Sequence, residues 1–582
     1  MSPVTLESIV RSLARVVALF LACTLMPAAT ALHVSEAGAV PDDGKCDLAA
    51  IHAAIRRAVR DNEPELQFAA GTYNLVHAGQ GTGQEEDRFL YIRNAEHLAL
   101  VGQVDHNGRP ATRLEREVPL SNDARPESFL HIEDCRTIAV RNFVLANNPP
   151  FGSTGRVVSV NERTDRVVVQ VLEGLPAYDG MRCASAHAWN LETGKLKRFG
   201  STPREATLTI GVNVDACWQA VPGTDARRLS MTGAGFARKV EVGDGISWHH
   251  TASADAHNQT VIEDSTNVVI ENIIMPNVTK MGLLAGYNHN LTLRKVRFEP
   301  ENGNLAVGGR DGMHLSMTSG RLLVEECYFK GLRMDPLVLR KTFGVIREMR
   351  SDSVIVAKPG YDVPPGDEIR FWAGKEPIDR PVRRCKRRQD GAFLYVMAKP
   401  LPAEVIVDTP ITYRTYSVDE GIIRDCVFED NFGSAIVNFE ENILVENCVF
   451  DNNAYQIKYG ANRVTGAFAR NNVFRNNVCA NTSWIDIARR GQPACLTIHS
   501  LNRYFDDPMY NQHIDIVGNV FRNPHRDEDA VAIDVRNALD IEMRENEFVG
   551  FGKHQRVHID KDTTRDIRLH DASGTAGKPE AR

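Results

Sequence analysis

The feature that most constrains the fold of this chain is a short pattern that recurs every 22 to 24 residues in its second half. The segments Ile422–Phe428 (IIRDCVF) and Ile443–Phe450 (ILVENCVF) alternate apolar and polar residues and end 22 residues apart. Similar segments, closed by Asn, Asp or Gly, end at Met275, Phe298, Phe474, Phe521 and Phe548. Short strands with turn residues at this period are typical of a β-solenoid. The pattern therefore predicts an all-β chain folded as a right-handed parallel β-helix.

Two stretches interrupt the repeat, and they resemble each other. The first covers residues 155–242 and the second residues 343–413. Val242–Trp248 (VGDGISW) matches Pro365–Phe371 (PGDEIRF), and each stretch begins with a Val-rich strand. We interpret them as two small antiparallel β-barrels inserted into the solenoid. Insertions of this kind emerge on one face of a β-helix and wall a cleft there.

The N-terminal part predicts how the solenoid is closed. Asp47 is a candidate N-cap, and the apolar residues that follow recur at helical spacing. A short helix here would cover the strand edges that an open end exposes. The predicted organisation is a signal peptide (1–31), the cap and first coils (32–154), the first barrel (155–242), the coils with the candidate site (243–342), the second barrel (343–413), C-terminal coils (414–565) and a disordered tail (566–582).

The first residues have the pattern of an export signal. Arg11 and Arg15 precede an apolar run at 16–25, and small residues follow up to Ala31. The run is too short to span a bilayer. We predict cleavage after Ala31 and a secreted or periplasmic protein, with a lipoprotein attached through Cys23 as the alternative.

Charge and cysteine spacing exclude several kinds of partner. The formal net charge is -7 over 582 residues, without a basic face, so nucleic acid is not the predicted partner. The 11 cysteines have no metal-binding spacing, although disulfides can form in an oxidising compartment. We predict no metal and no cofactor, and the sequence gives no indication of the oligomeric state. Cys327, Cys426 and Cys448 share one place in the repeat, which predicts an inward ladder of small side chains.

Two aspartates are separated by 24 residues, the length of one coil. Asp311 lies in the segment GRDGMHL (309–315) and Asp335 in GLRMDP (331–336). Neighbouring strands lie ~4.8 Å apart, so we expect the two carboxylates to stand close together. Carboxylate pairs are the catalytic groups of most glycosidases, and their titration is coupled. A single Asp in a β-helix turn is usually structural, but two in register between two insertions predict a catalytic pair.

Further polar residues near this pair are candidates for binding a glycan. The predicted substrate-binding residues are His314, Arg310, Arg333, Arg340, Trp248 and His249. The histidine three residues after Asp311 can donate hydrogen bonds to sugar hydroxyls or to a carboxylate. The arginines, with Lys341, would lower a carboxylate's pKa or bind an acidic sugar. The Trp-His pair suits either a wall on which a sugar stacks or a strand edge that re-enters the solenoid.

From about residue 242 to 345 the chain resembles glycoside hydrolase family 110, the exo-acting α-1,3-galactosidases. The resembling segments are Gly243–Asp244, Lys280–Ala285, Asn290–Arg294, Asp311–Ser316 and Val324–Gly331. The resemblance implies a β-helix with two inserted barrels and hydrolysis with inversion. It also implies that Asp311 and Asp335 are base or water-positioning residues.

The chain departs from the second motif of that family, Asp-Asp-Pro-x-Asn-x-His-Gly. Here the motif reads MDPLVLRK (334–341), so Met334 replaces the Asp that would help to supply the acid. Val338 and Arg340 replace the Asn and the His. A thioether cannot donate a proton, so another group supplies the acid, the substrate differs, or the protein does not hydrolyse.

Three functions follow from these observations. The leading hypothesis is a secreted glycoside hydrolase that acts on α-linked, galactoside-like glycans through the paired carboxylates. The second is a polysaccharide lyase, because the arginines suit an acidic substrate, although no compact run of Asp and Glu would hold calcium. The third is a glycan-binding protein that kept the cleft and lost the acid, for which Met334 is the signal.

Overall fold

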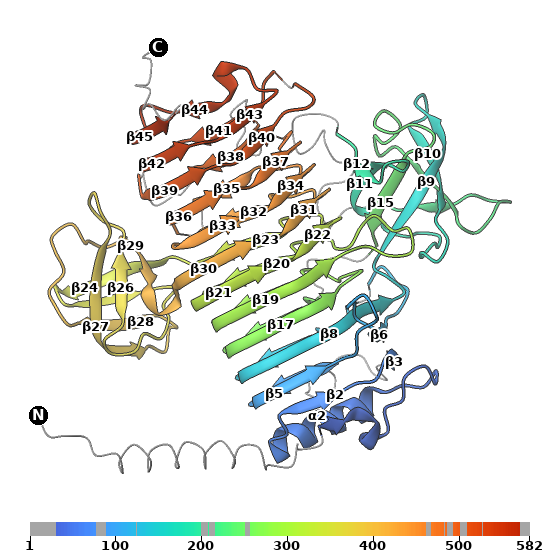
Figure 1. Cartoon of the computed structure of the whole chain (residues 1–582), viewed down its shortest axis with the longest axis horizontal. Helices are drawn as coiled ribbons and strands as arrows, with labels where there is room; N and C mark the ends of the chain where they lie inside the picture. The colour runs from blue at the N-terminus through green and yellow to red at the C-terminus, as the bar shows by residue number, and fades with distance from the viewer. Residues whose placement is uncertain are drawn as a thin grey trace, which may run out of the picture.

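The computed structural model describes residues 31–76, 89–123, 125–198, 208, 216–250, 257–460, 467–481, 483–485, 493–500, 509–526 and 528–570. Residues 1–30 of the predicted signal peptide, Cys23 among them, lie outside the described residues. The described chain forms a long column of parallel strands that carries two insertions (Figure 1). In this part of the chain, no helix is long and apolar enough to cross a membrane.

Two long parallel sheets form the column in the described residues, sheet A with 21 strands and sheet B with 11. The strands of sheet A are β1 (Leu32–His33), β2 (Glu65–Gln67), β3 (Gly71–Leu75), β5 (Glu96–Val101), β6 (Thr112–Glu117), β8 (Arg136–Asn148), β17 (Thr266–Ile274), β19 (His289–Phe298), β21 (Ser319–Glu325), β22 (Tyr328–Lys330), β30 (Val418–Arg424), β31 (Val427–Glu429), β33 (Ile443–Glu446), β34 (Val449–Asp451), β36 (Arg470–Arg475), β37 (Val478–Ala480), β39 (Asn511–Val517), β40 (Val520–Arg522), β42 (Ala538–Arg544), β43 (Glu547–Val549) and β45 (Thr564–His570). The strands of sheet B are β4 (Leu90–Arg93), β7 (Leu130–Glu133), β16 (Thr260–Glu263), β18 (Leu283–Gly286), β20 (Met313–Ser316), β23 (Leu337–Arg340), β32 (Ile436–Asn438), β35 (Ile457–Tyr459), β38 (Ala494–Ile498), β41 (Val531–Val535) and β44 (Val557–Ile559). The parallel β-helix predicted from the repeat is confirmed, and β45 continues it beyond residue 565, where we expected the tail to begin.

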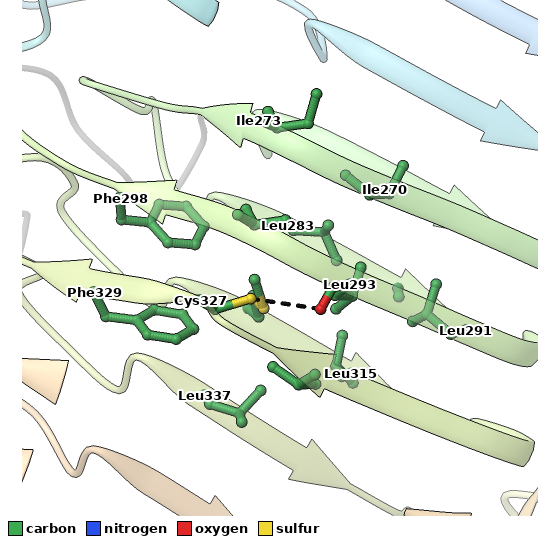
Figure 2. Close-up of a cluster of buried hydrophobic side chains, with 14 of the residues drawn as sticks. Ile270, Ile273, Leu283, Leu291, Leu293, Phe298, Leu315, Cys327, Phe329 and Leu337 are labelled. Atoms are coloured by element: carbon green, nitrogen blue, oxygen red, sulfur yellow. Dashed lines mark hydrogen bonds between the residues drawn. The ribbon is translucent and has the colours of Figure 1, made fainter. Parts of the chain in front are cut away.

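The core runs along the inside of the column, because alternate residues of each strand point inward. The rings of Phe298, Phe329, Phe428 and Phe450 stack on successive coils, with centroids 5.5, 4.6 and 5.0 Å apart. Figure 2 shows the first two of these rings packed among leucine and isoleucine side chains from both sheets. The aromatic repeat in the sequence is therefore a stack in the core.

The predicted cysteine ladder is also part of this core. Cys327, Cys426 and Cys448 are buried, and the strands that precede them pair in register. The Cys327 thiol donates to the Leu293 carbonyl at 3.5 Å (Figure 2). These thiols therefore fill inward positions as small apolar side chains.

One position of the repeat differs from our expectation. Phe474 lies on β36 opposite Val445, and the residue in register with Phe450 is Cys479, 29 residues later. The Phe474 ring still packs 5.9 Å from the Phe450 ring. Two inward positions of a coil can both carry an aromatic residue, and a count of phenylalanine spacings does not separate them.

A short helix covers the N-terminal end of the column, as predicted (Figure 1). It is α2 (Leu48–Asp61), and the 3-10 helix η1 (Val34–Ala37) precedes it. Asp47 is its N-cap residue, but the carboxylate does not cap the helix. It accepts hydrogen bonds from the amides of Val40 and Asn74 at 2.9 and 3.1 Å, which ties the helix to the first coil.

The first insertion is an antiparallel sheet. Its strands are β9 (Gly152–Asn161), β10 (Arg166–Val171), β11 (Ala184–Asn190), β12 (Lys195–Leu196), β13 (Gln219–Ala220), β14 (Arg228–Thr232) and β15 (Gly245–His249). The end strands β12 and β13 have two residues each and are not paired with each other in the described residues. The closed barrel that we predicted here is therefore not what the described residues form; 199–207 and 209–215 of this insertion lie outside them.

The second insertion is a closed antiparallel barrel, as predicted. Its strands are β24 (Gly344–Ser351), β25 (Val354–Ala357), β26 (Glu368–Phe371), β27 (Ile378–Arg387), β28 (Phe393–Met397) and β29 (Pro410–Tyr413), and the 3-10 helix η3 (Arg414–Tyr416) leads back to the column. A third 3-10 helix, η4 (Lys553–Gln555), lies near the C-terminal end. Each matching heptapeptide contributes a strand, β15 in the first insertion and β26 in the second.

The two insertions flank sheet B from opposite ends of its strands. The first insertion follows β8 of sheet A and precedes β16 of sheet B, so it joins at the N-terminal ends of the sheet B strands. The barrel follows β23, so it joins at their C-terminal ends. Figure 1 shows the insertions on opposite sides of the column. The outer face of sheet B, where β20 and β23 lie, is therefore placed between the two attachment points.

Candidate active site

Asp311 and Asp335 occupy equivalent places on neighbouring coils. Met313 on β20 pairs with Leu337 on β23, so the residues two positions earlier are at the same level. The Gly312 amide donates to the Asp335 carbonyl at 3.1 Å, which joins the two loops directly. The register expected from the 24-residue spacing is confirmed.

Glycines allow the loops to pass this closely. A Cβ on Gly312 would lie 2.6 Å from the Pro336 carbonyl oxygen. A Cβ on Gly433 would lie 2.1 Å from the Met334 carbonyl carbon. Either side chain would push aside the loop that carries Asp335, so the position of this carboxylate depends on both glycines.

The Asp311 carboxylate is buried, with 3% of the residue exposed. Its Oδ2 accepts a hydrogen bond from His314 Nδ1 at 2.8 Å. Its Oδ1 is also buried and has no hydrogen-bond partner among the described residues. A buried carboxylate oxygen without a protein donor is an acceptor that a water or a sugar hydroxyl can satisfy.

The Asp335 carboxylate is half-buried, and its Oδ1 accepts the Ser434 amide at 2.8 Å. Burial and, next, the charge of Asp311 raise the pKa of Asp335 to about 7. The Ser434 amide and the cations Lys458 and Arg310 stabilise the ionised carboxylate and so lower the pKa, which limits the rise. At neutral pH the Asp335 carboxyl is therefore close to half protonated and can donate a proton.

Three cations come together around Asp335. Arg310 and Lys458 act on its charge, and so does Arg333, whose guanidinium lies 4.8 Å from the centre of the Phe432 ring. Burial lowers the pKa of Arg333 and lowers that of Lys458 to about 8. In the part of the chain that the structure describes, none of the three cations forms an ion pair.

Arg340 and Lys341 are not brought to the carboxylates. They lie at the other end of β23, five and six residues beyond Asp335, or about 15–20 Å along an extended chain. Lys341 is buried, with its Nζ 2.8 Å from Glu440 and bonded to Ser417 Oγ at 3.0 Å. Lys341 thus compensates a buried carboxylate, and Arg340 is too distant to touch the same sugar ring as Asp311.

Trp248 and His249 lie on β15 of the first insertion and face different surroundings. Trp248 is fully buried in the core of the insertion, with its ring 4.8 Å from that of Trp218. Its ring is therefore not available to stack on a sugar, and the strand interpretation holds. The His249 ring packs against Gly309, next to Arg310, where burial lowers its pKa to about 4. Neutral His249 thus supports the loop that carries Asp311.

Three residues close to the carboxylates were missed from the sequence. Ser434 and Tyr455 pair with each other and continue the register of the two aspartates over the next two coils. Lys458 follows on β35, which pairs with β32. The coil register could have found them, counted onward from Asp335 after removal of residues 343–413.

Several curated proteins are similar to this chain, and no family model matches it. α-1,3-Galactosidase A of Shewanella woodyi is 22% identical, over 93% of this chain and 95% of that protein. α-1,3-Galactosidase B of Bacteroides thetaiotaomicron is 23% identical over 79% and 77%, and α-1,3-galactosidase A of Bacteroides fragilis 20% identical over 84% and 83%. The chain is a distant homologue of the α-1,3-galactosidases. The resemblance that we inferred from the motifs is therefore confirmed over most of the chain.

Solved structures are also similar to this galactosidase homologue. The family 28 exopolygalacturonase of Yersinia enterocolitica has a TM-score of 0.39 and 13% identity, over 94% of this chain and 78% of that one. The endo-xylogalacturonan hydrolase of Aspergillus tubingensis has a TM-score of 0.39 and 9% identity, over 92% and 98%. Among the described residues of the homologue, no group of three or more His, Cys, Asp and Glu side chains is placed to hold a metal ion.

Proposed function

We propose that this protein is a secreted or periplasmic glycoside hydrolase that cleaves an α-linked, galactoside-like glycan with Asp335 as the acid and Asp311 as the base. The observation that carries the proposal is the carboxylate pair on neighbouring coils, in which the pKa of Asp335 is raised to about 7. A carboxyl that keeps its proton near neutral pH can donate it to the leaving group, which the thioether of Met334 cannot do. The distant homology to α-1,3-galactosidases supports the reaction class.

In the proposed reaction each group has a role in a single displacement. Asp335 donates its proton to the glycosidic oxygen as the bond from that oxygen to the anomeric carbon breaks. Asp311 accepts a proton from the water that forms the new bond to the anomeric carbon, on the face opposite the leaving group. The Nδ1–H of His314 donates to the ionised Asp311 and orients it. Such a displacement inverts the anomeric configuration, as the family resemblance implies.

The test is the release of galactose from an α-1,3-linked galactobiose by the purified mature chain. Because each carboxylate moves a proton, Asp311→Asn and Asp335→Asn should each lower kcat by about 10²- to 10⁴-fold. A matched control is Asp425→Asn, since Asp425 is an exposed turn residue on another face with a φ of 55° that Asn adopts readily. Undiminished turnover in Asp335→Asn would reject its role as the acid.

Polysaccharide lyase activity is a second candidate, and Lys458 is the observation that favours it. Its pKa is lowered to about 8, so an appreciable fraction of this amine is neutral in mildly basic solution and can act as a base. Removal of the proton beside a uronate needs such a base and cations to neutralise the carboxylate. An unsaturated, ultraviolet-absorbing product from a uronate polysaccharide, abolished by Lys458→Met, would support the lyase. Binding without turnover in either assay would support a glycan-binding protein.

A further inference from the structure

We propose that the glycan bound here carries an anionic substituent, a carboxylate or a sulfate ester, which Arg310, Arg333 and Lys458 bind. The proposal rests on the proposed function, because it assigns a substrate class to the same site. The three cations come from three different coils, and each interacts electrostatically with Asp335. They reach it from the loops before β20 and β23 and from β35.

Several other basic residues of the neighbouring elements have carboxylate partners, although Arg340 at the far end of β23 has a buried Nε without a hydrogen-bond partner in the described residues. The paired ones are Lys341 with Glu440 at 2.8 Å, Lys330 with Glu429 at 3.1 Å and Lys195 with Asp451 at 2.9 Å. Within the described residues, Arg310, Arg333 and Lys458 have no such ion pair. The Nε atoms of both arginines are buried without a hydrogen-bond partner there. Buried cationic donors without acceptors are costly, which favours a ligand that supplies the acceptors.

The charge balance of the site also favours an anion. Three positive charges face the carboxylates Asp311 and Asp335, and the second of these is about half protonated at neutral pH. The excess is therefore between one and two positive charges, in a chain whose formal net charge is -7. A neutral sugar would leave this excess uncompensated, whereas one carboxylate or sulfate ester would balance most of it.

Arg333 is positioned in advance to bind a planar or tetrahedral oxyanion. Its guanidinium lies over the Phe432 ring, which is also stacked on His187 at 4.0 Å and 25° and contacts the edge of Tyr455 at 5.6 Å. Arg333, Phe432 and His187 line a small cavity between the first insertion and the column, together with His249, Gly308 and Asp430. The Asp430 carboxylate is already paired with Lys195 and Lys330, at 3.4 and 3.3 Å. A guanidinium fixed by stacking loses little freedom on binding, and it can donate two parallel hydrogen bonds to one anion.

The experiment compares three oligosaccharides of similar length as ligands of the mature chain by isothermal titration calorimetry. The probes are trigalacturonate, a sulfated galactan trisaccharide and a neutral α-1,3-linked galactotriose. One of the two anionic probes should bind at least tenfold more tightly than the neutral one in low salt, and added salt should reduce this preference. The anion that binds more tightly identifies the substituent.

Variants of the cations connect that preference to the site. Arg310→Met and Lys458→Met should each reduce the anionic preference about tenfold, since each removes one charged hydrogen bond. Arg333→Lys keeps the charge but loses the planar fork, so it should weaken anion binding while the fold is retained. The matched control is Arg321→Met, because Arg321 is exposed on sheet A and paired with Glu420 at 3.3 Å. Thermal unfolding of every variant verifies that it is folded.

Three results would overturn the proposal. They are equal affinity for the neutral and anionic probes, no binding of either anionic probe, and a preference that none of the folded variants changes.

The binding measurement tests this inference, and the turnover measurement tests the proposed function, so the two can fail separately. Hydrolysis of a neutral galactobiose without anionic preference would overturn the inference alone. Anionic preference that depends on these cations, without hydrolysis of any probe, would leave the inference standing and reject the hydrolase.

Discussion

At the scale of single residues, the proton on Asp335 is expected to set the pH range of catalysis. Its pKa is raised to about 7 from an ordinary 3.8, and the acid must carry its proton when the glycosidic bond breaks. We predict that kcat falls as the pH rises above about 7, approaching tenfold per pH unit. A pH–rate profile with saturating substrate measures this, and a flat profile up to pH 9 would assign the acid to another group.

The raised pKa of Asp335 also makes the stability of the fold depend on pH, which checks that pKa independently of catalysis. Because the folded pKa of Asp335 is above the unfolded value, the folded state holds more protons between about pH 4 and pH 7. Stability is therefore lost as the pH rises through this window. Asp335→Asn should remove that loss and be more stable than wild type at pH 8 by about 2 kcal/mol, roughly half the full linkage value because the side chain is only half-buried. Chemical denaturation at pH 4 and pH 8 tests the sign.

How far the site could be predicted depended on distance along the chain. The 24-residue spacing predicted the register of Asp311 and Asp335, because one coil is a local repeat. Lys458 comes 123 residues after Asp335, beyond the barrel, so only a coil register counted across residues 343–413 connects them. The sequence left Trp248 open between a sugar wall and a strand edge, because an aromatic residue beside histidines suits both, and only the packing of the insertion places its ring in the core.

At the scale of elements, the phenylalanine stack is expected to contribute strongly to stability. Phe428 is fully buried between Phe329 and Phe450, with centroids 4.6 and 5.0 Å away. Phe428→Ala would leave a cavity that rigid parallel strands cannot close, so we predict a loss of about 3–5 kcal/mol in the free energy of unfolding. Urea denaturation measures this.

The stack offers its own control near the C-terminal end of the column. Phe548 is half-buried, and in the described residues it stacks on Phe521 alone, at 5.6 Å. Phe548→Ala should therefore cost less than half as much as Phe428→Ala. Similar losses in both variants would mean that stacking on two sides adds nothing, and that the repeat only marks positions that face inward.

The insertions show where sequence similarity stops predicting structure. Their matching heptapeptides predicted β15 and β26 correctly, because a strand is specified by its own residues. Closure of a sheet depends on its edge strands instead. The barrel closes because β29 pairs with both β24 and β26, whereas β12 and β13, the end strands of the first insertion, are not paired with each other in the described residues.

At the scale of the whole molecule, the column is held by packing without covalent cross-links in the described residues. Ten cysteines are described there, and none of them is in a disulfide. Equivalent positions on neighbouring coils are one strand spacing apart, ~4.8 Å, with parallel side chains, whereas a disulfide needs Cβ atoms about 3.8 Å apart that point toward each other. The aligned Cys327, Cys426 and Cys448 are thus neighbours that the fold keeps reduced.

This arrangement predicts how the folded protein responds to thiol chemistry. Burial raises the pKa of the Cys327 and Cys426 thiols well above the ordinary value, so they present almost no thiolate to an oxidant. A reducing agent should leave Tm unchanged within about 1 °C, whereas loss of a disulfide worth 2–5 kcal/mol would lower Tm by several degrees. A thiol reagent should react at once with exposed Cys46 and reach the buried cysteines only on unfolding. A Tm that drops on reduction would show that the column depends on a cross-link, and prompt labelling of the ladder would show that its coils open in the native state.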